Sequence, residues 1–402
     1  MPFRALARNG TKIKKHEFTY FNTYTTMKNI LFLSTIITLL CGCKTSIDNN
    51  DNFLFDSNTP VCTSETKLSD IISIKRIVPL ETNDESLVGE YVGKIQKQGN
   101  RFYISFNRNT LLAFDENGKY LNKIGGVGQG PGEYNYLGDY DVTDEAVYIR
   151  DVEKVHSYKH DGTYLNTTHI DGIFGMNVAG DKILAFFNND SLVSHILTLD
   201  GEHINKHHPT SKVATIGRSS YYWPYKEGKY IFPFSCCNDA LIYDTQKNAY
   251  SYMQFIGLPD MLTTDRYNQL LTEKGFRGNV RDYARVVWPF NSNRSQMFIG
   301  TPKGKEEGIL WIKDLNTDES KAYDIAYLKN DVTFTSQWYR IFSGFARADN
   351  SFIAYIMPYE LKEALQEKED WHTESPFYKQ MKELADSLSD EDNFILIEYQ
   401  FK

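Results

Sequence analysis

Residues 125–134 read GGVGQGPGEY, with five glycines and one proline in ten positions. Glycine-rich loops bind phosphate in nucleotide sites, because closely spaced backbone N–H groups contact the anion. A phosphate-binding P-loop also needs Lys followed by Ser or Thr after its last glycine, whereas Glu133 follows here and would repel phosphate. The dinucleotide fingerprint fails too, since no helix-forming run follows and Pro131 lacks a backbone donor. We therefore predict a structural crossover between strands; the alternative is a binding loop that uses Gln129, Glu133 and Tyr134.

Aromatic clusters are a second candidate binding feature. They read YYWPY at 221–225, WPF at 288–290 and WY at 338–339, and each precedes a strand-like run. Such rings stack on sugars or peptides at a channel mouth, but large rings also fill protein cores, which is the favoured interpretation for a chain that is 14% aromatic. The candidate ligand contacts from these regions are Tyr222, Trp223, Trp288 and Trp338, together with Arg285 from a group of arginines (Arg281, Arg285, Arg294 and Arg340) that would suit acidic ligands.

Signals for metal binding and catalysis are weak. His156 and His160 straddle strand residues, and a zinc site needs three or more converging ligands. Asp139, Asp141 and Asp144 alternate as in a calcium loop, but the glycine and the bidentate Glu of an EF-hand are missing, so we interpret them as solvated or turn-capping carboxylates. Neither Gly-x-Ser-x-Gly nor His-Glu-x-x-His occurs. We therefore predict no catalytic residue, no metal and no cofactor.

Short strand-like runs recur along the chain and predict the fold that positions these residues. Asn-Gly or Asp-Gly follows the first three runs and supplies the positive φ values of tight hairpins. The turn glycines Gly118, Gly162 and Gly201 are 44 and 39 residues apart, and a period near 40 is typical of four-stranded propeller blades. We predict an all-β, six-bladed β-propeller of four-stranded antiparallel blades over residues 68–402. The six runs are 102–104, 147–149, 183–185, 230–232, 298–299 and 352–354.

The two ends of this domain and two helices complete the predicted architecture. The segments 71–78 and 394–401 should pair in one blade, which closes the ring and removes exposed strand edges. Thr264-Asp265 predicts a short capped helix inserted within 259–285. A C-terminal helix should begin at Ser375-Pro376 and pack on the outside or underside of the propeller, because Phe377, Met381, Leu384 and Leu388 share one face.

The N-terminus carries an export signal. Met27-Lys28-Asn29 precedes an apolar run from Ile30 to Leu40, which is shorter than the roughly 20 residues of a membrane-spanning helix. Leu40-Cys41-Gly42-Cys43 matches a bacterial lipobox and predicts cleavage after Gly42 with lipid attachment at Cys43; an unmodified Cys43 is the alternative. The predicted organisation is an over-long extension at 1–26, a signal peptide at 27–42 and a flexible tether at 43–67.

Charge and cysteine content limit the partners and the redox chemistry. Removal of residues 1–42 leaves 38 basic and 51 acidic residues, a net charge of −13. Nucleic acid needs a basic face, so that class of partner is excluded, and membrane attachment would depend on the lipid. Cys62, Cys236 and Cys237 are too few for a disulfide scaffold. Buried thiols at Cys236 and Cys237 are the default, and a vicinal disulfide or a bridge from Cys62 is the alternative.

Three motifs resemble the six-bladed β-propeller lipoproteins of Gram-negative bacteria, which are relatives of NHL-repeat propellers. The motifs are IVPLET at 77–82, FDENGK at 114–119 and GQGPGEY at 128–134. The resemblance covers roughly residues 68–401 and is most specific in the first two blades. It implies a fold and a lipid-anchored place in the outer membrane, on either its periplasmic or its surface side, but no catalytic residue.

Together these features give two functional hypotheses. The first is a monomeric, lipid-anchored binding or scaffolding module for a glycan, peptide or protein. The alternative is a hydrolase or lyase that acts on glycans or peptides with its site at the central channel, since propellers host both. Convergence of three or more carboxylates or histidines from several blades would favour the enzyme.

Overall fold

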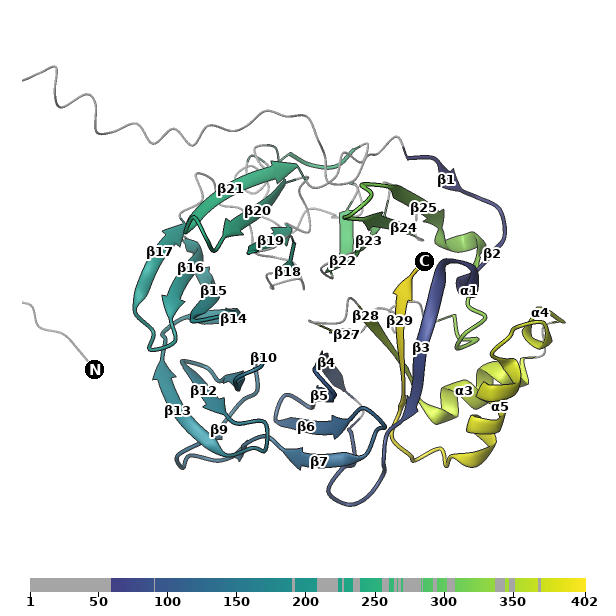
Figure 1. Cartoon of the computed structure of the whole chain (residues 1–402), viewed down its shortest axis with the longest axis horizontal. Coiled ribbons are helices and arrows are strands. Elements are labelled where there is room, and N and C mark those ends of the chain that lie inside the picture. The colour runs from purple at the N-terminus through teal and green to yellow at the C-terminus, as the bar shows by residue number, and fades with distance from the viewer. Residues whose placement is uncertain are drawn as a thin grey trace, which may run out of the picture. The chain divides into compact units, whose positions relative to one another are not determined.

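Six four-stranded antiparallel blades surround a common axis (Figure 1), which confirms the predicted all-β propeller. The structure is a computed structural model, and the residues that it describes belong to the unit Asn49–Lys402. They are residues 59–89, 91–189, 192–207, 223–225, 228–233, 239–254, 260–263, 266, 269, 283, 285–291, 295–301, 308–336, 344–346, 351–367 and 370–402.

Blades 1 to 3 follow one another along the chain, each starting with the strand nearest the axis and ending at the rim. Blade 1 comprises β4 (Val92–Gln98), β5 (Arg101–Phe106), β6 (Thr110–Asp115) and β7 (Tyr120–Lys123). Blade 2 comprises β10 (Asp139–Val142), β11 (Val147–Arg150), β12 (Lys154–Tyr158) and β13 (Tyr164–His169). Blade 3 comprises β14 (Ile173–Ala179), β15 (Lys182–Asn189), β16 (Leu192–Thr198) and β17 (His203–His207).

Blades 4 and 5 repeat this order, and blade 6 combines both ends of the domain. Blade 4 comprises β18 (Trp223–Pro224), β19 (Lys229–Pro233), β20 (Asp239–Asp244) and β21 (Ala249–Gln254). Blade 5 comprises β22 (Arg285–Asn291), β23 (Ser295–Thr301), β24 (Ile309–Asp314) and β25 (Ser320–Asp324). Blade 6 comprises β27 (Gly344–Ala346), β28 (Ser351–Ile356), β29 (Ile395–Phe401) and β3 (Ile72–Pro79).

The ring closes as predicted, because the first long strand is the outer strand of the last blade. β3 pairs antiparallel with β29 from Ile72 opposite Phe401 to Pro79 opposite Ile395. The inner strands of blades 6 and 1 also pair directly, with β27 parallel to β4 at Gly344–Ala346. This backbone pairing joins the two blades into one continuous sheet and ties the closure point together.

The core lies between the blades, which explains why the six central runs are apolar at consecutive positions. Alternate residues of a strand point to opposite faces, and here each face packs on a neighbouring blade. Val147 and Ile149 pack in the cluster shared with blade 1, whereas Tyr148 packs in the cluster shared with blade 3. The runs are therefore apolar at every position, as is typical of strands in sheets that are buried on both faces. The predicted hairpins are also present, with φ of +84°, +86° and +88° at Gly118, Gly162 and Gly201.

The chain joins the propeller before Leu68, where the predicted tether ends. β1 (Val61–Cys62) pairs parallel with β25, and β2 (Thr66–Lys67) pairs parallel with β26 (Leu328–Lys329). The short helices α1 (Leu68–Ile71) and η3 (Ile325–Tyr327) adjoin these strands. Because β25 is the outer strand of blade 5, β1 covers an edge that would otherwise be open to solvent.

Helices between β28 and β29 pack outside blade 6 (Figure 1). They are α3 (Pro358–Gln366), α4 (Asp370–Thr373) and α5 (Tyr378–Ser387). α5 is the predicted C-terminal helix: Met381 is buried, and Phe377, Leu384 and Leu388 pack on the same core. Apart from Arg266 and Gln269, the helix predicted from Thr264 lies outside the described residues. Within the described part of the chain, no helix is long and apolar enough to cross a membrane.

Candidate functional site

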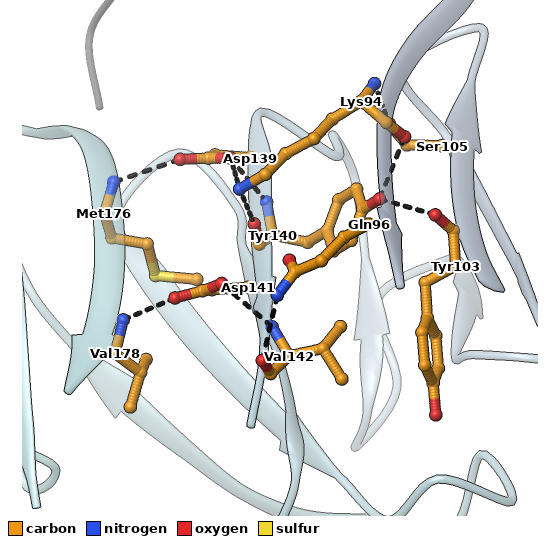
Figure 2. Close-up of polar contacts among 10 residues, drawn as sticks. All are labelled: Lys94, Gln96, Tyr103, Ser105, Asp139, Tyr140, Asp141, Val142, Met176 and Val178. Carbon is orange, nitrogen blue, oxygen red and sulfur yellow. Dashed lines mark hydrogen bonds and ion pairs between the residues drawn. The ribbon is translucent and has the colours of Figure 1, made fainter. Parts of the chain in front are cut away.

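Among the described residues, no strand pairs with the inner strands of blades 2 and 3 on their axis-facing side. The strand partner of β10 is β11, and that of β14 is β15. Buried backbone N–H and C=O groups on such an edge need other partners, because leaving them unpaired costs free energy. Figure 2 shows that side chains from the preceding blade supply these partners.

Two buried aspartates of β10 bond to the backbone of β14. Oδ2 of Asp139 accepts from the N–H of Met176 at 3.0 Å, and Oδ2 of Asp141 accepts from the N–H of Val178 at 2.6 Å. Their other oxygens accept from the N–H groups that follow them in the chain. The interpretation of these two residues as solvated or turn-capping carboxylates is therefore wrong, because both side chains are buried. Asp144 is exposed, as expected of a turn residue.

Polar side chains of β4 bond to β10 in the same way. Nζ of Lys94 donates to the carbonyl of Tyr140 and lies 3.4 Å from Oδ1 of Asp139. Nε2 of Gln96 donates to the carbonyl of Val142 at 2.9 Å. Lys94 and Gln96 are two positions apart, so they lie on the same face of β4 and reach alternate carbonyls of β10. Gln98 continues this row, since its Nε2 donates to the carboxylate of Asp144 at 2.6 Å.

A bulge in β4 directs Lys94 toward Asp139. The register of β4 against β5 shifts between Val92 and Ile95, and such bulges re-aim a side chain. Ser105 Oγ accepts from the Lys94 N–H at 2.9 Å, and the Tyr140 hydroxyl donates to the Lys94 carbonyl at 2.8 Å. The backbone groups freed by the bulge are thus bonded, which holds the lysine in place.

The electrostatics of this network indicate a structural role. Burial raises the pKa of Asp139, while Lys94 and the Met176 N–H act in the opposite direction. Both oxygens of Asp139 are occupied by backbone N–H groups and the lysine, which leaves neither directed at a substrate. The carboxylates of this network, those of Asp139, Asp141 and Asp144, all come from blade 2, whereas convergence from several blades would favour an enzyme. No group of three metal-ligating side chains occurs among the described residues.

A second buried network connects blades 6 and 1 where the ring closes. Lys97 on β4 and Glu398 on β29 form an ion pair at 3.0 Å, and both side chains are almost completely buried. Nε of Arg76 lies 3.1 Å from the other oxygen of Glu398, and its Nη1 lies 3.0 Å from Glu116 in blade 1. Because β3 is the strand that closes the ring, this network adds side-chain contacts to the β27–β4 pairing.

The histidine pair does not converge on a common point. Nδ1 of His156 lies 2.8 Å from Thr167 Oγ1 in the adjacent strand, and burial lowers the pKa of His156. His160 instead contacts the Tyr103 hydroxyl through Nδ1 at 2.6 Å and the Asp144 carbonyl through Nε2 at 3.0 Å. His156 therefore links two strands of blade 2, whereas His160 links blade 2 to β5 of blade 1.

The glycine-rich segment is a crossover from β7 to β10, as predicted. It contains the short parallel strands β8 (Gly126–Val127) and β9 (Glu133–Tyr134). Oε2 of Glu133 accepts from the Gly130 N–H at 2.8 Å, so this carboxylate closes its own loop. Tyr134 is fully buried and its hydroxyl donates to the Ile124 carbonyl, which removes it as a surface ligand contact. Gln129 is exposed.

The aromatic candidates lie in blades 4 to 6. Trp223 opens the inner strand β18 and is 7% exposed within the largest core cluster, in agreement with the core interpretation. Trp288 lies in a bulge of the inner strand β22, which begins at Arg285; their side chains are outside the described residues. Tyr222, Trp338 and Cys43 lie wholly outside them, as do Cys236 and Cys237. Cys62 is a free thiol, so no bridge from it is present.

Five loops of blades 1 to 3 lie at one end of the ring, and we call them the crossover face. Three of them lead from the outer strand of one blade to the inner strand of the next, which is β4, β10 or β14. The other two join the second and third strands of blades 1 and 2. Antiparallel alternation of strand direction brings these connections to the same end. The outer parts of the two longest loops also contact the next blade, through the bond from the Glu81 N–H to the Gly118 carbonyl and that from the Tyr158 hydroxyl to the Gly132 carbonyl. The loops, without residue 90, which is outside the described residues, are 80–91, 107–109, 124–138, 151–153 and 170–172.

Hydrogen bonds connect neighbouring loops of the crossover face. The N–H of Asn107 donates to the Tyr91 carbonyl at 3.0 Å, and the N–H of Leu137 donates to the Arg108 carbonyl at 2.7 Å. The carboxylate of Asp151 accepts from the N–H groups of residues 135 and 136, and the N–H of Ile170 donates to the Glu153 carbonyl at 3.0 Å. The five loops therefore form one bonded arc over three blades.

Large apolar side chains are exposed along this arc. Each is between 45% and 76% exposed; four come from three of the five loops, and Phe174 comes from the start of β14, next to loop 170–172. Clusters of exposed apolar residues commonly mark sites of interaction. The sequence reasoning missed this surface, because a single apolar residue in a loop carries no periodic signal. The residues are Leu87, Tyr91, Val127, Val152 and Phe174.

Comparison with known proteins gives a family and a fold. A family model described as "Domain of unknown function (DUF4934)" matches residues 53–400. One similar solved structure is that of an exported protein of Bacteroides fragilis NCTC 9343, which is 19% identical in sequence. The two structures superpose with a TM-score of 0.67, over 87% of this chain and 99% of the other. A DUF4221 family member from Bacteroides vulgatus ATCC 8482 is 8% identical, with a TM-score of 0.50 over 82% and 98% of the two chains. At these identities the likeness concerns the fold alone. No curated protein matches the chain.

Proposed function

Because this chain belongs to the DUF4934 family and folds as a six-bladed propeller, we propose that it is a binding module of the bacterial cell envelope. Its partner is a protein or peptide that docks on the crossover face. The observation that carries this proposal is the group of exposed apolar side chains on a hydrogen-bonded arc of loops. A surface held by bonds between loops changes little on binding, which lowers the entropic cost of association.

The inner-strand network supports binding rather than catalysis. The polar side chains of the inner strands of blades 1 and 2 bond to backbone groups of the next blade. They keep the blades in register and so fix the positions of the loops above them. A hydrolase or lyase remains the alternative proposal, and no arrangement among the described residues favours it.

Site-specific photo-crosslinking in cells tests the docking surface. A photo-crosslinking residue placed at Tyr91 or Phe174 should give discrete covalent adducts, because both side chains are exposed on the crossover face. The matched control is Glu145, an exposed residue in the β10–β11 turn at the opposite end of blade 2. Adducts of the same size and yield from Glu145, or none from either face position, would contradict the proposal.

We also propose lipid anchoring to the outer membrane through Cys43, on the support of the lipobox. The anchor would lie at the end of the tether that leads to β1 on the rim of blade 5. Cys43→Ser should move the mature protein from the detergent-extractable membrane fraction to the soluble fraction, as measured by fractionation and immunoblotting. Equal distribution of wild type and variant, or a soluble wild type, would contradict anchoring. The relation to NHL-repeat propellers stays a prediction.

A further inference from the structure

We infer that the crossover face binds a basic segment of protein or peptide that presents large apolar side chains beside its Lys or Arg residues. This inference rests on the proposed function and adds the chemistry of the partner. Two properties of the face support it, its exposed apolar side chains and its charge.

The charge of the crossover face is strongly acidic. Six carboxylate side chains are exposed among the described residues of its loops, whereas Arg108 is the single basic residue in the same loops. Nη1 of Arg108 donates to the Tyr136 hydroxyl at 3.0 Å, and its guanidinium lies over the ring of that tyrosine. This cation is therefore held by the face itself. Two of the carboxylates, those of Glu81 and Glu133, also accept from the N–H groups of Tyr120 and Gly130. The other four belong to Asp84, Glu85, Glu153 and Asp171.

The acidic and apolar groups alternate across the same loops. Val152 and Glu153 are adjacent in the loop of blade 2, and Asp171 and Phe174 flank the start of β14 in blade 3. Asp84 and Glu85 precede Leu87 and Tyr91 in the loop that enters blade 1. A partner that contacts one class of side chain therefore contacts the other, and like charge on the partner would be repelled.

The turns between the first and second strands of blades 2 and 3 lie at the opposite end of the ring and lack the apolar component. They include Glu145 in blade 2 and Asp181 in blade 3, both exposed. Neither turn carries an exposed large hydrophobic residue, and Leu121, Leu165 and Ile204 are exposed on outer strands instead. The combination of acidic and apolar residues thus distinguishes the crossover face from these turns.

Charge complementarity excludes other occupants of the face. An anionic lipid surface would be repelled by the carboxylates, and so would the same face of a second copy. The chain's own tether at 44–58 contains three aspartates and one lysine, so it carries the same sign of charge. A basic segment with apolar side chains is the occupant that matches both properties.

Selection from a random 12-residue peptide library displayed on phage, panned on the purified full-length protein, tests the inference. Selected peptides should carry a net positive charge and at least one large apolar residue. Synthetic copies should bind about tenfold more weakly to Tyr91→Ser/Phe174→Ser, because buried anchor residues dominate such interfaces. Glu153→Lys/Asp171→Lys should also bind several-fold more weakly, and its affinity should depend less on salt than that of the wild type. The matched control, Glu145→Lys/Asp181→Lys, should bind like the wild type.

The outcomes separate the inference from the proposed function. Selected peptides that are neutral or acidic would overturn the basic-partner inference. So would peptides whose affinity falls as much for the control pair as for Glu153→Lys/Asp171→Lys. Either result would leave the proposed binding module in place. A failure to select any peptide that prefers the wild type over Tyr91→Ser/Phe174→Ser would overturn the inference. If crosslinking from Tyr91 and Phe174 also gives no adduct, the proposed function fails with it.

Discussion

Glu398→Ala should lower the free energy of unfolding by about 3–5 kcal/mol, the cost of breaking a buried ion pair by removing one partner. The Lys97 ammonium, 3.0 Å from the Glu398 carboxylate, would keep its charge in a site that is almost fully buried. Urea unfolding monitored by tryptophan fluorescence measures this change.

Glu116→Ala is the matched control for Glu398→Ala. Glu116 also pairs with Arg76, at 3.0 Å, but both of those side chains are more than a third exposed. Exposed ion pairs contribute about 0–1 kcal/mol, so this variant should remain close to the wild type. The double variant Lys97→Met/Glu398→Leu should recover most of the lost stability, since apolar replacement of a buried pair is often neutral or stabilising. Equal losses for the two single variants would show that the Glu398 site is solvated.

The fold could be predicted from sequence because local signals repeat. Each of the six apolar runs became the second strand of a blade, since burial between two neighbouring blades requires apolar residues on both faces. The Asn-Gly and Asp-Gly turns fixed the hairpins between the third and fourth strands. The pairing of the two ends followed from the need to cover strand edges.

Elements without such repeats were missed or misplaced. β1 and β2 have two residues each, too few to show alternation, so they were assigned to the tether. α3 had a readable signal that was not used: Pro358 stands at the first turn, and Leu361 and Ala364 are buried at helical spacing. α4 has only four residues and lacks any comparable pattern.

The candidate site was harder to predict, because its partners are distant in sequence. The alternation of Asp139 and Asp141 is visible in the sequence. What decides their role is the open backbone edge of β14, which lies 37 residues further along the chain. No local pattern reports that the ring geometry brings this edge within 3.0 Å of a carboxylate.

Asp141→Ala should lower the free energy of unfolding by about 2–6 kcal/mol, because it leaves two buried N–H groups without their acceptor, each worth about 1–3 kcal/mol. These are the N–H of Val178 at 2.6 Å and the N–H of Val142 at 3.0 Å. Asp144→Ala is the matched control, since Asp144 is exposed and loses only its bond to Gln98. Its cost should be within about 1 kcal/mol.

Hydrogen exchange separates a local from a global effect of Asp141→Ala. In the Asp141→Ala protein, exchange of the Val178 amide should accelerate beyond the change expected from the loss of global stability, because that N–H loses its direct acceptor. The Met176 amide, bonded to Asp139 one pair along the strand, should follow the global change only. Equal acceleration at both amides would mean that the carboxylates hold β14 as a unit. Unchanged exchange at Val178 would mean that its N–H has another partner and that Asp141 does not connect blades 2 and 3.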